Sequence, residues 1–463
     1  MRAVVIQTAM KSFTSFAAAA LLFSAIPFAA AHQSTPSPWN GPTFREFSGV
    51  NQGNPKSVLA PCIGWDRPTF FSDGAEPSKG IWNHKYISDY QAQVLADRRV
   101  GIRCLTILGY MPNWAGPNPH GPPTNVADWT DYVTRIVHDL HAAPYNENYF
   151  QIWNEATPRG GAFYVGSFDD YMNKIQIPAG KAIHDAGCKV VWGGWPGGLV
   201  SAWDFINMMN KYSAWDSIDV VDLHYFNWTD LKIIHDYAVA HGHTNLGYWQ
   251  TEVGFTTDPL AIPTKYIGAL QWALTSGVWN ARDRFKYFYF AEWAPDDPAV
   301  ASYHRCLLTG DKLNFHGLIL QNMARLLGGG RLAALTGVTG SGLGNGSSIA
   351  AFKVGSATDV IAVQMSAADY GSGGVKTLTI PISRAGITKA ERIDLDGSHV
   401  VDITRSLVAY GSRTEVTAST QDAAGSNAAK WNGTVMGDKP GWDNAVFYVR
   451  LTRGSYLHRQ HVK

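Results

Sequence analysis

Short apolar runs alternate with amphipathic stretches along the first two thirds of the chain. Six runs have the length and apolar character of buried strands, and they lie at residues 102–108, 149–153, 189–192, 218–224, 247–251 and 285–291. Two further runs, at 47–50 and 61–66, would bring the total to eight. Because strands that alternate with helices form parallel sheets, and eight such strands close on themselves, the pattern predicts an α/β fold, a (β/α)8 TIM barrel.

The stretches between the runs predict helices. The clearest one follows the Pro/Gly-rich segment 112–123, and it places Trp129, Tyr132 and Ile136 on one face at a period of 3.6 residues. A helix expected at 169–186 contains Pro178, which should kink or split it. Segment 51–60 is barely long enough for a helix of its own. Further helices are expected at 203–212, 231–241, 263–275 and 315–327.

Beyond Gly330 the pattern changes. A glycine-rich segment is followed by short runs with alternating apolar positions, at 349–354, 360–365, 378–382, 393–395 and 446–451. This pattern predicts a small C-terminal antiparallel β-sandwich. The domains are therefore expected to be the barrel at 40–330 and the sandwich at 331–463, where the sandwich braces the barrel rather than binding carbohydrate.

The first residues are typical of an export signal. Arg2 and Lys11 provide a basic region, an apolar run follows at 16–28, and Ala29, Ala30 and Ala31 provide a cleavage site. A membrane anchor is the alternative, but the run is shorter than the roughly 20 residues of a membrane span and contains Pro27. We therefore expect a signal peptide at 1–31, no membrane anchor after its cleavage, and a secreted or periplasmic protein.

Composition narrows the classes of function. Charged residues make up 16% of the 463 residues and the formal net charge is +1, which argues against disorder and against a nucleic-acid partner. The 17 Trp residues must pack internally or bind something flat. The four cysteines lack the spacing of a zinc site, and the disulfide pairing stays open. The histidines at 235, 241 and 243 lie on an expected helix and at its end, where solvated histidines are common, so no metal is expected.

Polar residues that directly follow the apolar runs are the candidates for chemistry, because the active site of a barrel lies at the carboxyl ends of its strands. Glu155 and Glu252 both occupy such positions, 97 residues apart. Over three βα units this is about 32 residues each, so the two side chains should face one another across the mouth of the barrel. A structural ion pair is the alternative for either residue taken alone, and Glu292 could replace either partner.

Two carboxylates across a cleft support the cleavage of a glycosidic bond, because one protonates the leaving oxygen and the other attacks the anomeric carbon or activates water. We expect Trp153 and Asn154 to raise the pKa of Glu155 by partial desolvation, as suits an acid. Glu252 is expected to stay ionised through hydrogen bonds, as suits a nucleophile.

The runs QIWNE at 151–155 and YWQTE at 248–252 resemble the strand-four and strand-seven signatures of the retaining glycoside hydrolases of clan A. The stretches 65–67, 76–80 and 101–115 look most like family 39, which includes xylosidases, iduronidases and bacterial exopolysaccharide endoglycosidases. The resemblance covers about residues 47–330. It implies a TIM barrel in which Glu155 is the acid/base, Glu252 is the nucleophile, and no metal or organic cofactor takes part.

The same resemblance implies roles for further residues. Asn154 would bind the sugar 2-hydroxyl, His224 and Tyr225 would orient the nucleophile, and Trp293 would form the floor of the subsite in which the sugar is cleaved. Such enzymes commonly have an Arg in strand two, for which Arg67 is the candidate.

Tyr110 and Trp114 follow strand three, where they either form a sugar platform or pack beneath loops. The sequence thus predicts an exported retaining glycosidase that acts on a β-linked poly- or oligosaccharide, with carbohydrate as its only implied partner. A non-catalytic polysaccharide-binding protein on a degenerate barrel and a transglycosylase with the same residues are the alternatives.

Overall fold

The computed structural model describes residues 41–51, 58–157, 163–197, 200–253, 260–290, 307–309, 312–344, 346–365, 375–419 and 446–454. The predicted signal peptide, Glu292, Trp293 and Cys306 lie outside these residues. The thiols of Cys62, Cys104 and Cys188 are buried and free.

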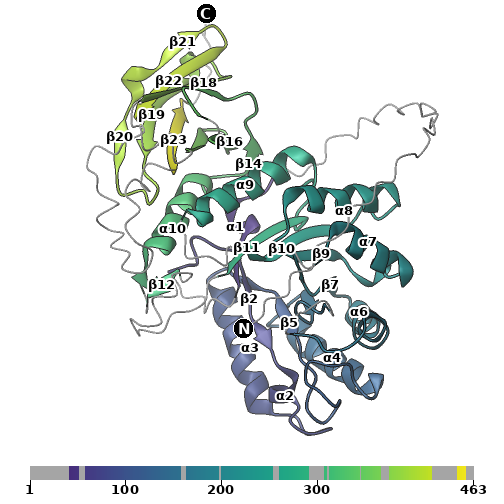
Figure 1. Cartoon of the computed structure of the whole chain (residues 1–463). Helices are drawn as coiled ribbons and strands as arrows, with labels where there is room; N and C mark the ends of the chain where they lie inside the picture. The colour runs from purple at the N-terminus through teal and green to yellow at the C-terminus, as the bar shows by residue number, and fades with distance from the viewer. Residues whose placement is uncertain are drawn as a thin grey trace, which may run out of the picture. The chain divides into compact units, whose positions relative to one another are not determined.

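One parallel sheet forms the wall of a TIM-like barrel, as predicted (Figure 1). Its strands pair in the order β3-β5-β6-β7-β9-β10-β11-β1-β2-β4, with β8 beside β9. The strands are β1 (Ser48–Asn51), β2 (Trp65–Arg67), β3 (Thr69–Phe70), β4 (Arg103–Cys104), β5 (Thr106–Leu108), β6 (Tyr149–Ile152), β7 (Lys189–Val191), β8 (Trp195–Pro196), β9 (Val220–His224), β10 (Gly247–Val253) and β11 (Phe285–Phe290).

The strand order begins with β3 and β5 and ends with β2 and β4, and these are the halves of two strands that are each broken once. Only Pro68, which has no backbone N–H, separates β2 from β3, and only Leu105 separates β4 from β5. The pairing continues through both breaks, because the Leu105 amide donates to the Asp66 carbonyl (2.8 Å) and the Ile107 amide donates to the Pro68 carbonyl (3.1 Å). The run expected at 61–66 is shifted, since β2 begins only at Trp65.

Helices follow the strands, and their apolar faces are buried. The expected face of α4 (Val126–His141) is confirmed, since Trp129, Tyr132 and Ile136 are all buried. The other helices are α1 (Phe44–Phe47), α2 (Ser72–Ala75), α3 (His84–Arg99), α5 (Phe168–Asp170), α6 (Ile177–Asp185), α7 (Ala202–Lys211), α8 (Trp228–Ala240), α9 (Ala261–Ser276) and α10 (Phe315–Leu327).

The helix expected at 169–186 is split, as Pro178 predicts. A π-helical segment, Tyr171–Gln176, separates α5 from α6, and Pro178 lies in the first turn of α6. Proline is tolerated in that turn because its missing N–H would have no partner within the helix there.

Aromatic side chains fill the interior of the barrel. Trp65 and Trp249 meet edge to face at 5.2 Å, and Phe288 packs against both rings. The ammonium of Lys286 lies 4.9 Å from the centre of the Trp65 ring. These packed side chains fill the interior of the barrel, and the polar groups of the site lie at its mouth.

Two antiparallel sheets follow the barrel. Their orders are β14-β16-β17-β23-β19-β20 and β15-β18-β22-β21, and one buried cluster holds residues of both, among them Phe447 and Val416. The strands are β14 (Leu332–Ala334), β15 (Thr339–Ser341), β16 (Ser348–Val354), β17 (Thr358–Gln364), β18 (Val375–Ile380), β19 (Ile387–Ile393), β20 (Val400–Asp402), β21 (Val408–Tyr410), β22 (Arg413–Ser419) and β23 (Val446–Arg453). The run expected at 393–395 was misplaced, because β19 ends at Ile393.

Barrel and antiparallel sheets are in direct contact. The side-chain amide of Asn322, on α10, donates to the carbonyls of Asp394 (2.9 Å) and Leu395 (3.0 Å). Phe352 and Val360 belong to the same buried cluster as the barrel core. No helix within the described ranges is both long and apolar enough to cross a membrane.

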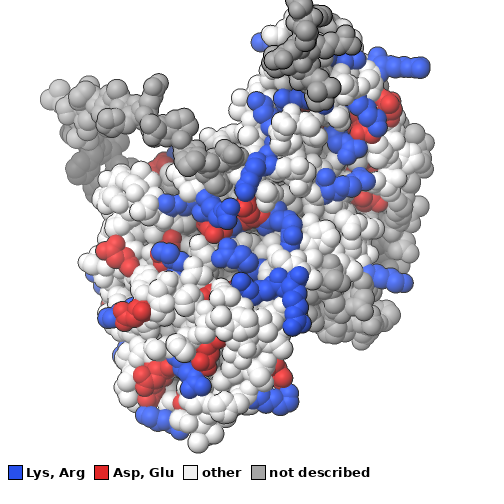
Figure 2. All heavy atoms as spheres, turned by 180° about the vertical axis from the view of Figure 1, so that it is seen from behind, with Lys and Arg blue, Asp and Glu red and all other residues white. Residues whose placement is uncertain are grey.

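Acidic side chains accompany the basic ones on the surface. On the face in Figure 2, Lys and Arg side chains gather across the middle, with Asp and Glu among and below them. Several basic groups are in ion pairs, for example Arg331 with Glu46 (2.5 Å) and Arg103 with Asp283 (3.3 Å).

Candidate active site

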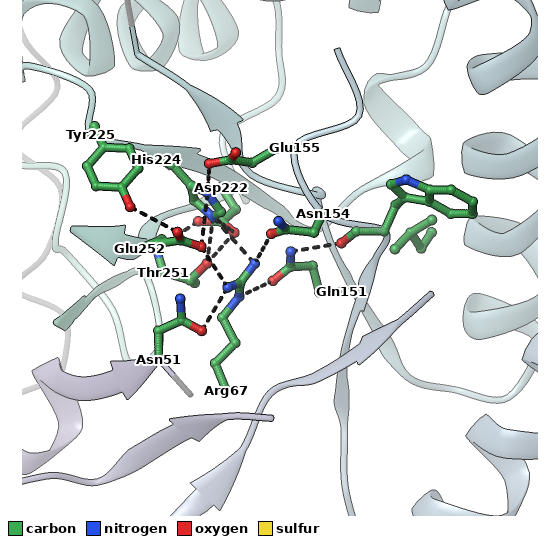
Figure 3. A network of polar contacts seen from close by, with 12 residues as sticks. Asn51, Arg67, Gln151, Asn154, Glu155, Asp222, His224, Tyr225, Thr251 and Glu252 are labelled. Carbon is green, nitrogen blue, oxygen red and sulfur yellow. Dashed lines mark hydrogen bonds and ion pairs between the residues drawn. The ribbon is translucent and has the colours of Figure 1, made fainter. Parts of the chain in front are cut away.

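Side chains from the carboxyl ends of four strands converge at the mouth of the barrel (Figure 3). β6 leads into Glu155, β9 ends at His224, β10 carries Glu252, and β2 ends at Arg67. One carboxylate oxygen of Glu155, one of Glu252 and a ring nitrogen of His224 all lie within 4.8 Å of one another. The two glutamates therefore face each other, as their spacing in the sequence predicted.

Arg67 lies at the centre of the network, and its side chain is 1% exposed. Its Nη1 donates to Glu252 Oε2 (3.2 Å) and to Asn51 Oδ1 (2.9 Å), Nη2 donates to Asn154 Oδ1 (2.6 Å), and Nε donates to Gln151 Oε1 (2.7 Å). The fork geometry of a guanidinium suits such a set of acceptors. Arg67, the candidate from sequence, therefore lies next to one of the two carboxylates.

Glu252 has a partner on each oxygen. The hydroxyl of Tyr225 donates to Oε1 (2.9 Å), opposite the Arg67 bond to Oε2. Burial and the nearby charge of Glu252 raise the pKa of Tyr225, so its hydroxyl keeps its proton and acts as a donor. The two donors hold the Glu252 carboxylate in a single orientation.

His224 lies between the two glutamates and is fully buried. Its Nδ1 is 2.7 Å from Glu155 Oε1 and 3.5 Å from Glu252 Oε2, and its Nε2 is 3.2 Å from Thr251 Oγ1 and 3.7 Å from Asp222 Oδ2. Burial favours the neutral ring, but the charge of Glu252 and the bonds to Asp222 and Glu155 outweigh it and raise the pKa of His224 to about 9. At neutral pH the ring is therefore an imidazolium.

The pKa of Glu155 differs from the expected one. Burial alone would raise the pKa of Glu155, as its position beside Trp153 suggests, but the hydrogen bond and charge of His224 and the charge of Arg67 lower it below 4.5. In the free protein the proton thus lies on His224, next to Glu155. Sequence reasoning missed this effect because His224 is 69 residues away along the chain.

The backbone around these residues is unusual. Trp153, Glu155 and Tyr225 have φ values of 66°, 45° and 58°, a region that bulky residues rarely adopt and that is often found at functional sites. At Gly194, which also has a positive φ, a Cβ atom would lie 2.1 Å from Nε2 of His224. Glycine at this position therefore makes room for the imidazole ring.

The remaining predicted residues differ in their placement. Tyr110 is hydrogen-bonded to the side chain of Asn154, and burial raises its pKa to about 12. Trp114 donates from Nε1 to the Glu76 carbonyl (2.8 Å) and packs against the barrel core, which are the contacts of loop packing. Trp293 lies outside the described residues.

Asn51, Gln151, Asp222 and Thr251 join the network without having been predicted. Gln151 donates to the Trp153 carbonyl (2.9 Å), and Thr251 Oγ1 donates to Asp222 Oδ2 (2.6 Å). Gln151 lies on β6 and stands in the QIWNE run that the sequence analysis singled out, and this run is the signal that could have found it.

The cluster of Glu155, His224 and Glu252 contains donor atoms that suit a metal ion. These atoms are already joined by hydrogen bonds, and the guanidinium of Arg67 lies 3.2 Å from Glu252. A cation would have to replace the imidazolium proton beside this fixed positive charge, which makes the cluster a poor match for a metal. The histidines at 235, 241 and 243 join no such cluster in the described part of the chain.

Comparison with known proteins supports this picture at the level of the fold. No protein-family model matches the chain, and no curated protein matches its sequence. A family 39 glycoside hydrolase from Bacteroides cellulosilyticus WH2 matches with a TM-score of 0.59 at 15% identity, over 89% of this chain and 81% of that one. A glucosidase from Croceicoccus marinus matches with a TM-score of 0.56 at 14% identity, over 90% and 98% of the two chains.

A monomeric β-xylosidase from Caulobacter crescentus CB15 matches with a TM-score of 0.53 at 12% identity, over 89% of this chain and 97% of that one. At such identities the likeness concerns the fold. The resemblance to the family 39 glycoside hydrolases of clan A, predicted from the sequence motifs, is confirmed in the fold of the chain.

Proposed function

We propose that the protein is a retaining glycoside hydrolase that cleaves β-linked bonds of a poly- or oligosaccharide with Glu155 and Glu252. The observation that carries the proposal is the pair of carboxylates with oxygens within 4.8 Å of one another. Retaining enzymes have carboxyl groups about 5 to 5.5 Å apart, whereas inverting enzymes need about 6.5 to 9.5 Å to admit a water molecule.

In the first step Glu252 attacks the anomeric carbon, and the bond from this carbon to the leaving oxygen breaks. Glu155 gives its proton to that oxygen. In the second step Glu155 takes a proton from water, the water oxygen bonds to the anomeric carbon, and Glu252 is released. The two donors on Glu252, Arg67 and Tyr225, support the nucleophilic role because they fix the orientation of its carboxylate.

Glu155 needs a proton to act as the acid, and a neighbouring side chain can supply it. It lies on His224, whose Nδ1 is 2.7 Å from Glu155. A bound sugar would bury Glu155 further and raise its pKa, and this favours transfer of the proton from His224 to Glu155. Asn154, which Arg67 orients, would bind the 2-hydroxyl of the sugar.

The proposal extends to the rest of the chain. We propose that residues 1–31 are a cleaved export signal, so that the enzyme acts outside the cytoplasm. We also propose that the two antiparallel sheets form a sandwich that braces the barrel, because they share one buried cluster and contact α10.

The test measures hydrolysis of β-linked polysaccharides and aryl β-glycosides by the wild type and by Glu155→Gln and Glu252→Gln. Each variant should lose at least about a thousandfold in kcat/KM on the substrate that the wild type cleaves. Glu415→Gln, a change on β22 away from the network, is the matched control and should keep full activity.

Proton NMR of the first product gives the stereochemistry, and we expect the β anomer to form first. Full activity in Glu252→Gln, or an α anomer as first product, would contradict the proposal. Polysaccharide binding without turnover would favour the non-catalytic binding protein, and transfer to an added acceptor sugar in preference to water would favour the transglycosylase.

A further inference from the structure

Two buried polar side chains, Asp222 and Thr251, lie against the imidazole ring of His224. Asp222 stands two residues before His224 on β9, so both side chains point to the same face of the strand, and Thr251 lies on the paired strand β10. All three residues are fully buried. The contacts among them are therefore shielded from bulk water, and each donor must find its acceptor within the protein.

The hydrogen bonds of Thr251 have a defined direction. Its backbone N–H donates to Asp222 Oδ1 (3.0 Å), and its hydroxyl donates to Asp222 Oδ2 (2.6 Å). A threonine hydroxyl has a single proton, so Oγ1 can only accept from a further partner. That partner is Nε2 of His224, at 3.2 Å (Figure 3). Nε2 must therefore carry a proton in this arrangement.

The other ring nitrogen of His224 faces the two carboxylates. Nδ1 lies 2.7 Å from Glu155 Oε1 and 3.5 Å from Glu252 Oε2. Glu252 Oε2 already accepts from Arg67 (3.2 Å), so Glu155 is the better acceptor for the Nδ1 proton. One nitrogen thus faces an acceptor that requires its proton to stay, and the other faces a carboxylate that can take the proton.

Arg67 is the charged group that opposes this arrangement. Its Nη2 lies 3.5 Å from Nε2 of His224 and would donate to that nitrogen if the ring had no proton there. This distance is longer than an ordinary N–H hydrogen bond, and the same Nη2 donates to Asn154 Oδ1 at 2.6 Å. The carboxylate of Asp222, whose Oδ2 is 3.7 Å from Nε2, favours the proton on Nε2. The contacts with Thr251 and Asp222 therefore outweigh the contact with Arg67.

We propose that Asp222 and Thr251 are positioning residues that keep a proton on Nε2 of His224, so that the ring releases its other proton, on Nδ1, to Glu155. In this step the Nδ1–H bond breaks, its electron pair stays on the ring, and the proton bonds to Glu155 Oε1. The ring becomes neutral, and Glu155 becomes the acid that protonates the leaving oxygen. The proton that Glu155 later takes from water returns to Nδ1 when the product leaves. This inference rests on the proposed function, because it concerns the proton that the acid uses.

Asp222→Asn reverses the chain of hydrogen bonds without changing its shape. The new amide keeps its oxygen for the Thr251 N–H and donates from its nitrogen to Thr251 Oγ1. The hydroxyl proton of Thr251 must then turn toward Nε2 of His224, which favours a ring with its proton on Nδ1. Thr251→Ser keeps the hydroxyl and should behave as the wild type does.

Kinetics with leaving groups of different acidity test the acid step. A dinitrophenyl glycoside needs almost no proton on its leaving oxygen, whereas a phenyl or alkyl glycoside of the same sugar does. Asp222→Asn should therefore lower kcat/KM at least about tenfold on phenyl and alkyl glycosides and change it little on dinitrophenyl glycosides. Asp219→Asn is the matched control, since Asp219 lies directly before β9 and contacts another histidine, His184 (2.8 Å), outside the network.

Nitrogen-15 NMR of labelled histidine reports the ring itself and needs no turnover. The signal of His224 is the one that His224→Asn removes. In a titration from pH 6 to pH 10, the neutral ring of the wild type should hold its proton on Nε2. The pKa of His224, about 9 in the wild type, should fall by at least about one pH unit in Asp222→Asn, and the proton of the neutral ring should move to Nδ1.

The inference is overturned if Asp222→Asn lowers kcat/KM equally on all leaving groups or on none, or if neutral His224 of the wild type carries its proton on Nδ1. Either result, with hydrolysis that still needs Glu155 and Glu252, would leave the glycosidase standing. Failure of the proposed function has a different signature. The wild type would then hydrolyse no glycoside, while an Nε2 proton that moves in Asp222→Asn would still identify Asp222 as the group that decides which nitrogen of His224 is protonated.

Discussion

Arg67 connects the nucleophile candidate to three amide side chains that hold the mouth of the barrel together. Its guanidinium donates to Glu252, Asn154, Gln151 and Asn51, and water has almost no access to it. Removing one partner of a buried ion pair leaves the other charge without compensation, which costs more than the pair itself contributes. The residue therefore affects both activity and stability.

We predict that Arg67→Met lowers the free energy of unfolding by about 3 to 5 kcal/mol and kcat/KM by at least about a hundredfold. Urea unfolding and steady-state kinetics measure the two effects. Arg135→Met is the control, because Arg135 pairs with Asp139 on the solvent side of α4 and should change stability by less than about 1 kcal/mol. Equal effects of the two substitutions would contradict the central place of Arg67.

His224 gives the protein a pH dependence with a defined sign. Its pKa is about 9 in the folded protein, above the ordinary value of 6.5, so the folded state binds this proton more tightly than the unfolded chain. The stabilisation is complete below pH 6.5 and is lost as the pH rises through 9.

We predict that the free energy of unfolding of the wild type falls between pH 6.5 and pH 9 and that His224→Asn flattens this part of the curve. Urea unfolding at steps of half a pH unit measures it. His138→Asn, a change at an exposed residue of α4, should leave the slope as it is. An identical slope in His224→Asn would mean that the imidazolium is not the group that titrates.

Helix α3 carries a buried acidic side chain, Asp97, that the sequence analysis did not single out. Asp97 is buried near the end of α3, and the thiol of Cys104 on β4 lies 3.4 Å from its Oδ2. Burial raises the pKa of Asp97 to about 7, since no described cation compensates the charge. The folded protein therefore favours the neutral acid, which contributes stability below about pH 3.8 that is lost as the pH rises through 7.

We predict that Asp97→Asn is more stable than the wild type at pH 8 and that its stability depends less on pH between 4 and 7. The asparagine keeps the shape of the neutral acid and carries no charge to bury. Thermal unfolding at a series of pH values measures the difference. Asp89→Asn, on the exposed side of α3, is the control, and a wild-type-like slope in Asp97→Asn would refute the assignment.

At the scale of the whole molecule, the barrel and the antiparallel sheets share buried surface. Residues from β16 and β17 lie in the same apolar cluster as the barrel helices, and Asn322 satisfies two carbonyls beyond β19. Two units joined in this way should unfold together, because separating them would expose apolar area and leave polar groups unpaired.

We predict a single calorimetric transition for the wild type, with Asn322→Ala destabilising the protein by about 1 to 3 kcal/mol. Gln321→Ala, at the exposed neighbouring position, should have little effect. Two separate transitions in the wild type, one for the barrel and one for the sheets, would contradict bracing.

The errors of the sequence analysis have physical causes. Helix α3 was not expected because its buried residues Ile87, Tyr90 and Val94 stand among polar ones, so its apolar stripe is narrow. Strand β22 was missed because its buried positions include Thr414 besides Val416 and Ala418, and a buried threonine does not read as apolar. The pattern reports hydrophobicity, and burial follows it only on average.

The sequence by itself determined the order of the strands and the residues that stand at their carboxyl ends. Periodicity is a local property, and the rule that parallel strands present their carboxyl ends at one mouth converts it into a site. This rule placed Glu155, His224 and Glu252 in one site before any interatomic distance was known. Tertiary structure alone decided where the proton lies and which charges meet, because pKa values depend on separations between strands that are far apart in the chain. The charge of His224 and the hydrogen bond from Arg67 to Glu252 were decided by the tertiary structure alone.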